Sequence, residues 1–339
     1  MRDMGGMMDD AYLKGYADQC VLVTGGAGAI GSNLCQALLE LGAKKVMVLD
    51  DLSSAERWNL PEAPRVVFVH GSVLDERDLK RVFAERPGVV YHLAALFANQ
   101  NSIDHPEEDL MVNGLGTLKV LQYAHLTGVE RVVYASSGCS VYGKSPLPLR
   151  EDFLSMDLDT PYQITKMLGE LYCNFYRNFY GLQTVCTRFF NSYGPGEIPG
   201  RYRNVIPNFI YWAMRGEALP ITGTGEETRD WTYVGDIVDG LLRAGTMKEA
   251  VGEAFNLASG RETRVLDVAR WVNEETGNPA GVRYVARRKW DTKERLLASV
   301  DKAKRILGYE PRTDFREGLR RTVEWFRAHW AEIQASARF

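Results

Sequence analysis

The sequence lacks the features that mark membrane, disulfide-bonded and metal-binding proteins. No stretch of its 339 residues approaches the roughly 20 consecutive apolar residues of a membrane-spanning helix. The five cysteines are an odd number without a Cys-x-x-Cys pair, which predicts reduced thiols. The five histidines are scattered, and none pairs with a cysteine at metal-ligand spacing. We therefore expect a cytoplasmic protein that binds neither a metal nor a membrane.

An excess of one charge sign is also missing. The formal net charge of −3 gives no electrostatic reason to expect a nucleic-acid partner. The 45% hydrophobic content is sufficient for a full-sized core. Residues 1–19 carry acidic side chains where a signal peptide needs an apolar segment, so we interpret them as a floppy or capping N-terminal extension.

Short apolar runs alternate with helical patterns from residue 20 to about residue 190. Helices are predicted near 106–127 and 161–180. The runs "CVLVTG", "KVMVLD", "RVVFVHG", "GVVYHLA", "RVVYAS" and "TVCTRFF" are almost continuously apolar, as in parallel strands covered by helices on both faces. This alternation predicts an α/β fold with a doubly wound parallel sheet of the Rossmann type.

The pattern changes after residue 190. Loops rich in Gly, Pro and Arg precede short mixed elements and a helix near 315–332. We predict a larger domain over 20–190 and a smaller, interleaved α/β domain over 191–339, with segments that return to the first. The smaller domain is expected to close over the carboxyl edge of the sheet, where ligands of such folds bind.

A glycine-rich turn follows the first predicted strand. Gly25, Gly28 and Gly31 lie where a strand passes into a helix, at spacings that allow a tight turn and close approach of a pyrophosphate. The phosphates would then face free backbone N–H groups at the helix N-terminus. Asp50 ends the next strand, where a carboxylate accepts hydrogen bonds from ribose hydroxyls and repels a 2′-phosphate. The predicted cofactor is NAD.

Several motifs occur together in one order along the chain. They are T-G-x-x-G-x-x-G (24–31), "HLAA" (92–95), "VNGLGT" (112–117), Tyr162-x-x-x-Lys166, "RFFNSYGP" (188–195) and "RDWTYV" (229–234). The set resembles the extended short-chain dehydrogenase/reductase family, most closely its NAD-dependent nucleotide-sugar epimerases and dehydratases. The resemblance covers about residues 20–325.

The resemblance implies the NAD contacts. Ser72 stands where the family commonly has an aspartate that contacts adenine. The implied cofactor-binding residues are Gly25, Gly28, Ala29, Ile30, Gly31, Asp50, Ser72, Leu93, Ala94, Ala95, Asn113, Ser136, Tyr162 and Lys166.

Tyr162 and Lys166 are four residues apart and thus share one helix face. A phenol with a pKa near ~10 is a poor base at neutral pH. The lysine ammonium and the positive nicotinamide ring would both stabilise the phenolate. The resemblance to the family implies that Tyr162 is the base that removes a sugar hydroxyl proton while a hydride moves to NAD.

The stretch "SSGCSVYG" (136–143) departs from the epimerase pattern. The family's catalytic Ser or Thr falls on Gly138, and its loss is expected to leave room for a water or a closer-lying sugar. If the strand stays extended, Ser136, Gly138 and Ser140 share one face. Ser140 is then the first candidate to replace the missing hydroxyl, and Cys139 is the second. The alternative is that the tyrosine–lysine pair suffices.

The resemblance also implies a substrate site for a nucleotide-diphosphate sugar, with UDP as the expected nucleotide. An arginine fork suits phosphate oxygens. The implied substrate-binding residues are Asn191, Asn204, Val205, Arg229, Arg288 and Asp291.

The leading interpretation is NAD-dependent epimerisation at carbon 4 through a transient 4-keto intermediate. A 4,6-dehydratase or decarboxylase is the first alternative, although those members typically carry Thr-Asp-Glu or Thr-Ser-Glu at positions 138–140. A catalytically silent NAD-binding protein is the second alternative. The helices near 106–127 and 161–180 resemble those that pair as a four-helix bundle in family homodimers, which predicts a homodimer.

Overall fold

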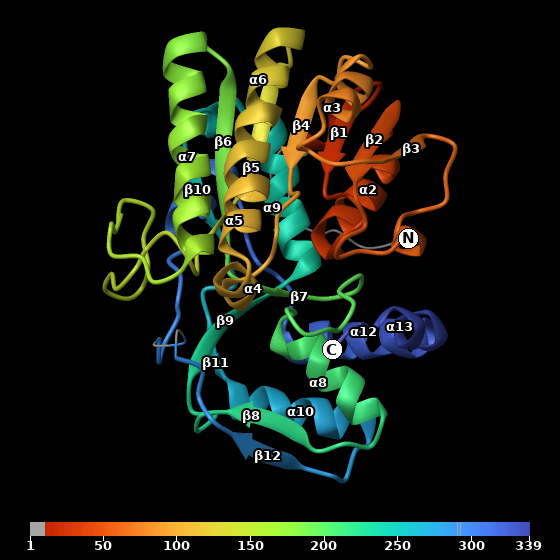
Figure 1. Cartoon of the computed structure of the whole chain (residues 1–339), viewed down its shortest axis with the longest axis vertical. Helices are drawn as coiled ribbons and strands as arrows, with labels where there is room; N and C mark the ends of the chain where they lie inside the picture. The colour runs from red at the N-terminus through yellow and green to blue at the C-terminus, as the bar shows by residue number, and fades with distance from the viewer. Residues whose placement is uncertain (1–10, 290, 292) are drawn as a thin grey trace.

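Seven parallel strands form the largest sheet, in the order β10-β6-β5-β4-β1-β2-β3 (Figure 1). The computed structural model describes residues 11–289, 291 and 293–339. The strand order reverses at β1, because β2 and β3 extend the sheet on one side while β4, β5 and β6 extend it on the other. The predicted doubly wound sheet is thus confirmed. Its strands are β1 (Cys20–Thr24), β2 (Lys45–Asp50), β3 (Val66–His70), β4 (Val89–His92), β5 (Arg131–Ser137), β6 (Gln183–Phe189) and β10 (Ala254–Leu257).

Helices cover both faces of this sheet, which explains the continuous apolar runs. Val21 and Val23 in β1 pack into one core cluster, whereas Leu22 between them packs into the other. The first cluster lies under α2 (Ala29–Glu40), α9 (Val234–Thr246) and α11 (Asp301–Leu307). The second lies under α3 (Glu76–Phe83), α6 (Thr117–Thr127) and α7 (Pro161–Tyr180).

The predicted helix over 161–180 coincides with α7. Thr160 caps its start by accepting a hydrogen bond from the Gln163 N–H, and Gly181 ends it with φ +73°. The helix predicted near 106–127 is composite, because α5 (Pro106–Asp109) and α6 are joined by a π-helical segment, Leu110–Gly116. A short helix, α4 (Asn99–Asp104), precedes them. Within the described part of the chain, no helix has both the length and the apolar character needed to cross a membrane.

The described part of the N-terminal extension packs against the sheet's helices. Residues 1–10 of that extension lie outside the described residues. The helix α1 (Ala11–Lys14) is followed by Tyr16, which is fully buried and donates a hydrogen bond to the Leu242 carbonyl. Tyr12 donates to Asp239 at 2.8 Å. Residues 11–19 therefore cap α9, which excludes the floppy alternative for this part.

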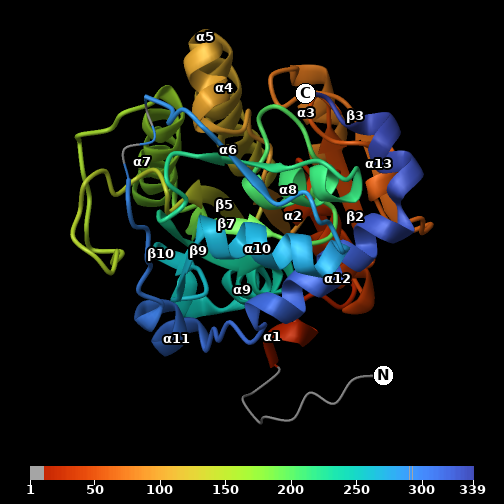
Figure 2. The same ribbon diagram turned by 90° about the horizontal axis from the view of Figure 1, so that it is seen from below.

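The second half of the chain builds a smaller body below the carboxyl edge of the large sheet (Figure 1). Figure 2, seen from below, shows α8, α10, α12 and α13 spread across this end of the molecule. Its core contains Phe209, Trp231 and Phe326. Its elements are β7 (Asn191–Tyr193), α8 (Val205–Met214), β8 (Leu219–Thr222), β9 (Thr228–Tyr233), β11 (Glu262–Arg264), α10 (Val265–Thr276), β12 (Val282–Val285), α12 (Phe315–Ala328) and α13 (Trp330–Ser336). Elsewhere in the described residues, Arg57–Asn59 and Lys248–Ala250 form short 3-10 helices.

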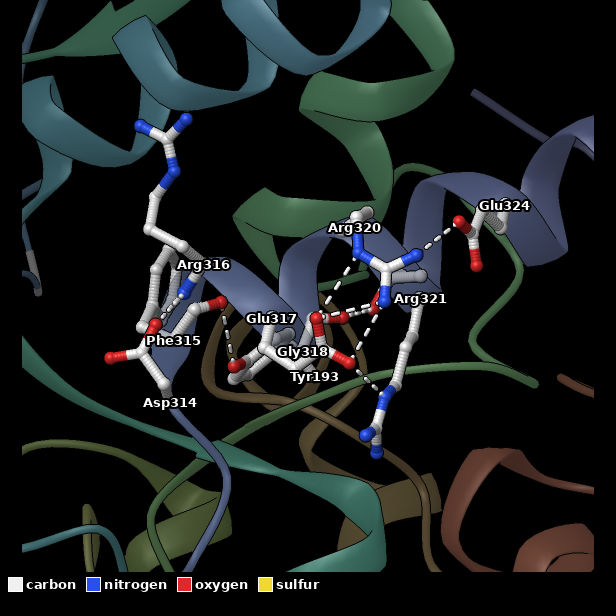
Figure 3. A network of polar contacts seen from close by, with 10 residues as sticks. Tyr193, Asp314, Phe315, Arg316, Glu317, Gly318, Arg320, Arg321 and Glu324 are labelled. Carbon is white, nitrogen blue, oxygen red and sulfur yellow. Dashed lines mark hydrogen bonds and ion pairs between the residues drawn. The ribbon is translucent and has the colours of Figure 1, made fainter.

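A polar network on α12 fixes the end of β7 (Figure 3). The Tyr193 hydroxyl donates to the Phe315 carbonyl at 3.2 Å. Position 318 must be glycine, because a Cβ there would lie 2.3 Å from the Tyr193 oxygen. Beside this contact, Glu317 accepts hydrogen bonds from Arg320 and Arg321. The helix thereby holds the short strand that carries Asn191 into the cavity described below.

Candidate active site

One cavity of about 710 Å³ runs along the carboxyl edge of the large sheet and against the smaller body. A volume of this size is typical of a small-molecule site. Of the residues predicted for the site, all except Asn113 line it. The structure therefore brings the two halves of the predicted site into one space.

The glycine-rich turn lies where the strand order reverses. Gly25 has φ +69°, and a Cβ on it would lie 2.6 Å from the backbone N of Ala94. A Cβ on Gly31 would lie 2.4 Å from the Gly25 carbonyl oxygen. Gly28 precedes α2, whose first N–H groups have no partner within the helix. This arrangement can hold a pyrophosphate on the helix N-terminus.

Asp50 has a second role that the sequence analysis missed. Its carboxylate accepts hydrogen bonds from the N–H groups of Ala27 and Leu52, both at 2.9 Å. Burial raises the pKa of Asp50, and these two hydrogen bonds oppose the rise. Asp50 can therefore fix the glycine-rich turn while its remaining lone pairs face ribose hydroxyls.

Three predicted cofactor residues have their side chains engaged elsewhere. Asn113 is buried outside the cavity lining, and its amide binds both backbone groups of Leu96 and the Asp109 carboxylate. This corrects the expected contact, since Asn113 can position the segment after β4 but does not face the cavity. The Ser136 hydroxyl donates to Glu170, and the Ser72 hydroxyl accepts from the Leu74 N–H at 3.2 Å.

Tyr162 and Lys166 lie together at the start of α7, only 7% and 3% exposed. Lys166 Nζ is 5.6 Å from the centre of the Tyr162 ring and donates to the Ala135 carbonyl at 2.8 Å. Burial, together with Asp109 and Cys139, raises the pKa of Tyr162, whereas burial lowers the pKa of Lys166 to about 8. The expected stabilisation of the phenolate combined the Lys166 ammonium with a positive nicotinamide ring, and among the protein's own groups burial outweighs it. A further positive charge beside the ring, as on an oxidised nicotinamide, would favour the phenolate.

The chain turns after Ser137, so the assumption of an extended strand is wrong. β5 ends at Ser137, and its carbonyl accepts hydrogen bonds from the N–H groups of Ser140 and Val141. The turn brings the Ser140 hydroxyl 2.8 Å from that of Ser137. Ser140 is fully buried, and Ser137 is slightly exposed at the cavity wall. The two hydroxyls form a pair that the two-residue period could not reveal.

The space beside Gly138 is filled by a side chain of the chain itself. A Cβ on Gly138 would lie 2.0 Å from Cε2 of Phe190 and 2.5 Å from two neighbouring ring atoms. The prediction that this position leaves room for a water or a closer sugar is therefore wrong. The aromatic ring occupies the volume that a serine side chain would need.

Cys139 lies at the cavity wall, where its thiol contacts Asn191 Oδ1 at 3.6 Å. Burial raises the pKa of Cys139 to about 11, although Lys293 and Arg229 oppose the rise. The thiol is thus protonated near neutral pH and is a poor general base.

The predicted substrate residues line the end of the cavity formed by the smaller body. Arg229 pairs with Asp291 at 2.9 Å, so two of these residues neutralise each other. Asn204 donates to Glu197 at 2.9 Å and immediately precedes α8, which begins at Val205. Arg288 also lines the cavity.

Glu197 and Lys293 are two of the charged cavity residues that the sequence analysis did not predict. Glu197 is 5% exposed, and its Oε2 atom has no hydrogen-bond partner among the described residues. Burial raises its pKa to about 7. Lys293 reaches the Cys139 carbonyl at 2.8 Å from a loop after β12. Neither lies in a recognisable motif, so only the fold shows that they face the cavity.

The family model of the NAD-dependent epimerase/dehydratase family matches residues 21–258. A UDP-glucose 4-epimerase from Mycolicibacterium smegmatis is 37% identical over 311 residues, which cover 90% of this chain and 98% of that protein.

Two solved structures are also similar to this chain in sequence and in fold. Epimerase Mth375 from Methanothermobacter thermautotrophicus is 59% identical, with a TM-score of 0.96 and coverage of 97% of this chain and 98% of that one. The enzyme WbmF from Bordetella bronchiseptica, solved in complex with NAD+ and UDP, is 37% identical, with a TM-score of 0.83 and coverage of 95% and 96%.

The first prediction concerns the packing at Gly138. Gly138→Ser would restore the hydroxyl of the epimerase pattern, but its Cβ collides with the Phe190 ring. We expect a loss of ~1–3 kcal/mol in the free energy of unfolding, as for overpacked cores, and no gain in activity. Gly138→Ala should cost a similar amount, and Phe190→Leu in the same chain should recover part of it. Denaturant unfolding measures these differences, and an unchanged midpoint for Gly138→Ser would contradict the assignment.

The second prediction concerns the buried carboxyl of Glu197. Its pKa of about 7, against a usual 4.5, means that the folded protein holds this proton more tightly than the unfolded chain. The resulting loss of stability is small at low pH, grows as the pH rises from about 4.5 to 7, and is complete above that range.

Glu197→Gln removes this ionisation and retains an oxygen that can accept from Asn204. The variant should be more stable than the wild type by on the order of 3 kcal/mol at pH 8 and by less than about 1 kcal/mol at pH 5. The exposed Glu62 provides the matched control, since Glu62→Gln should show no such pH dependence. Equal shifts at both pH values would refute the buried ionisation.

Proposed function

The chain belongs to the NAD-dependent epimerase/dehydratase family, and on that premise we propose that it epimerises carbon 4 of a UDP-sugar through a transient 4-keto intermediate. The observation that carries this proposal is that Tyr162 and Lys166 line the same cavity as the glycine-rich turn and Asp50. A reacting sugar and a dinucleotide can therefore meet beside the phenol.

The cofactor fits the residues present. The turn at Gly25–Gly31 leaves a side-chain-free approach to the N–H groups of α2, and Asp50 offers carboxylate oxygens at the ribose position. Held by these residues, NAD would supply a hydride acceptor for carbon 4 that regains its oxidised form when the hydride returns to the same carbon.

The protein's own residues handle the proton. Tyr162 Oη accepts the proton of the carbon-4 hydroxyl and later returns it to the keto oxygen. Lys166, held by the Ala135 carbonyl, places a positive charge near the tyrosine ring. We propose that the Ser137 hydroxyl orients the sugar hydroxyl and that Ser140 acts through it, because Ser140 is fully buried and donates to Ser137.

The end of β5 favours epimerisation over dehydration or decarboxylation. Those reactions need an acid and a base at the strand end, where this chain has Gly138, Cys139 and Ser140. With its pKa raised to about 11, the Cys139 thiol does not supply a base near neutral pH.

The third prediction tests the reaction. Purified protein should carry bound NAD and interconvert UDP-glucose and UDP-galactose, or another pair of carbon-4 epimers, without added cofactor. Tyr162→Phe should lower turnover by ~10²–10⁴-fold, the scale of a lost proton-handling group, while NAD stays bound. Product analysis over a panel of UDP-, dTDP-, GDP- and CDP-sugars measures this, with bound NAD quantified in each preparation.

The same assay compares the turnover of alanine variants at Ser137 and Ser140. Ser137→Ala should lower turnover more than Ser140→Ala, since only the latter leaves the cavity-facing hydroxyl in place. A dehydrated or decarboxylated product, or full activity of Tyr162→Phe, would contradict the proposed function.

We further propose a homodimer formed by α6 and α7, which lie side by side on one face of the sheet (Figure 1). Leu171, Phe175 and Phe179 recur every four residues along α7 and are 55%, 46% and 71% exposed. The rings of Phe175 and Phe179 stack at 5.5 Å. Leu126 at the end of α6 is also exposed. An exposed apolar stripe of this kind is typical of an interface.

The fourth prediction follows from this stripe. The wild type should be dimeric at micromolar concentration, and the double variant Phe175→Asp, Phe179→Asp should be monomeric because its charges oppose burial against a second copy. Size-exclusion chromatography with light scattering measures the mass. Leu154→Asp changes an equally exposed apolar side chain outside α6 and α7 and serves as the control. A monomeric wild type or a dimeric double variant would disprove this interface.

A further inference from the structure

A buried carboxylate close to the reacting pair takes no part in the proposed proton transfer. Asp109 ends α5, is fully buried and lies outside the cavity lining. Its Oδ1 atom accepts a hydrogen bond from the Asn113 amide at 2.6 Å, and its Oδ2 atom accepts one from the Thr165 hydroxyl at 2.8 Å. Burial raises the pKa of Asp109, whereas these hydrogen bonds and Lys166 oppose the rise. Because a buried carboxylate among neutral donors costs stability, we expect it to have a role beyond packing.

The hydrogen bond to Thr165 links Asp109 to the start of α7. Thr165 lies three residues after Tyr162 and one before Lys166 in this helix. The Thr165 hydroxyl also lies 3.2 Å from the carbonyl oxygen of Tyr162. Because one hydroxyl contacts both groups, Asp109 is tied to the turn of α7 that carries the reacting pair.

The hydrogen bond to Asn113 links Asp109 to the tyrosine ring. The Asn113 side chain also binds the backbone N–H and the carbonyl of Leu96. The next residue, Phe97, lines the cavity, and its ring meets the Tyr162 ring edge-on, with centroids 6.0 Å apart and planes at 88°. Asp109 therefore supports both the backbone of Tyr162 and the ring that packs against it.

The charge of Asp109 acts on the same two residues. Burial is the main reason that the pKa of Tyr162 is raised, and the Asp109 charge adds to the rise. For Lys166, burial lowers the pKa to about 8, and the Asp109 charge opposes this change. A negative charge at this place thus favours the proton on the phenol and the positive charge on the ammonium.

Three other titratable groups beside the pair carry no charge near neutral pH. Burial raises the pKa of the Cys139 thiol to about 11. Burial also raises the pKa of Tyr134, whose ring centre lies 5.3 Å from the lysine ammonium. Burial, followed by the lysine charge, lowers the pKa of His92 to about 3. The negative charge beside the pair therefore comes from Asp109.

We propose that Asp109 is a positioning residue for Tyr162 and Lys166, an inference that rests on the proposed function. Its hydrogen bonds hold the start of α7 and the backbone beside Phe97. Its charge sets the pH range in which Tyr162 can accept a proton while Lys166 stays charged. Asp109 itself neither takes up the proton nor touches the ligand, because it lies outside the cavity lining.

The test measures the pH profile of kcat/KM for carbon-4 epimerisation. Asp109→Asn removes the charge but keeps the shape, and its amide can still bond to Asn113 and Thr165. Both limbs of the bell-shaped profile should move to lower pH by ~0.5–1 pH unit, because the phenol loses its proton and the ammonium its charge more readily. Asp109→Ala also removes the hydrogen bonds, so it should show the same movement with a plateau ~10-fold or more lower, as for a misplaced reacting group. Thr165→Val keeps the charge and breaks one hydrogen bond, so it should lower the plateau without moving either limb.

Glu107→Gln is the matched control, since it removes an exposed carboxylate of α5 outside the cavity lining and should leave the profile unchanged. Bound NAD and the midpoint of denaturant unfolding are measured for every variant. A folded, NAD-loaded Asp109→Asn whose limbs do not move would overturn the inference. Failure of both Asp109 variants to fold would also overturn it, because the role would then be purely structural. A wild type that epimerises none of the nucleotide sugars contradicts the proposed function itself, and this result differs from limbs that stay in place in an active enzyme.

Discussion

The close approach of β1 and β4 at the reversal of strand order is the constraint on which the rest of the cavity depends. At this point Gly25 lies so near the Ala94 backbone that a side chain has no room. The absence of that side chain lets the turn fold over the N-terminus of α2, and Asp50 from the neighbouring strand holds it by accepting the Ala27 N–H. A phosphate-sized space next to a ribose-sized one follows directly from this backbone contact.

A second glycine at a strand end, Gly138, has the opposite consequence. At Gly25 the missing side chain leaves backbone N–H groups available, whereas at Gly138 the Phe190 ring fills the vacated volume. The hydroxyl function therefore lies beside that position, in the pair formed by Ser137 and Ser140. The buried ion pair of Arg188 and Glu170 is bound to β5, because Glu170 also accepts a hydrogen bond from the Ser136 hydroxyl of that strand. Breaking such a pair leaves an unpaired buried charge, so this region tolerates little change.

The sequence predicted those elements whose structure is determined by a local pattern of residues. Six of the seven strands of the large sheet follow from runs that are apolar on both faces, whereas β10 was not predicted. The helix α7 follows from Thr160, Pro161 and Gly181 at its ends. The tyrosine–lysine pair was identified through the family resemblance, and helical spacing predicted only that the two side chains share one face. The turn after Ser137 could not be predicted from the local sequence, and the ring that packs against Gly138 comes from Phe190, which follows β6. The contacts of Asn113 could not be predicted either, because its motif does not show that its side-chain amide hydrogen-bonds to the backbone N–H and carbonyl of Leu96.

The charged groups of the cavity differ in how far the protein itself satisfies them. Arg229 and Asp291 neutralise each other, and each oxygen of Asp50 accepts one hydrogen bond from a backbone N–H group, so these side chains already have partners within the protein. Glu197 is different, because its Oε2 atom is buried without a hydrogen-bond partner among the described residues, and burial raises its pKa although Arg203 opposes the rise. A ligand group of opposite charge gains the most binding free energy where the protein group has already lost its hydration. The motifs therefore account for the glycine-rich turn and the tyrosine–lysine pair, whereas the buried carboxyl of Glu197 is a feature of the cavity that no motif reveals.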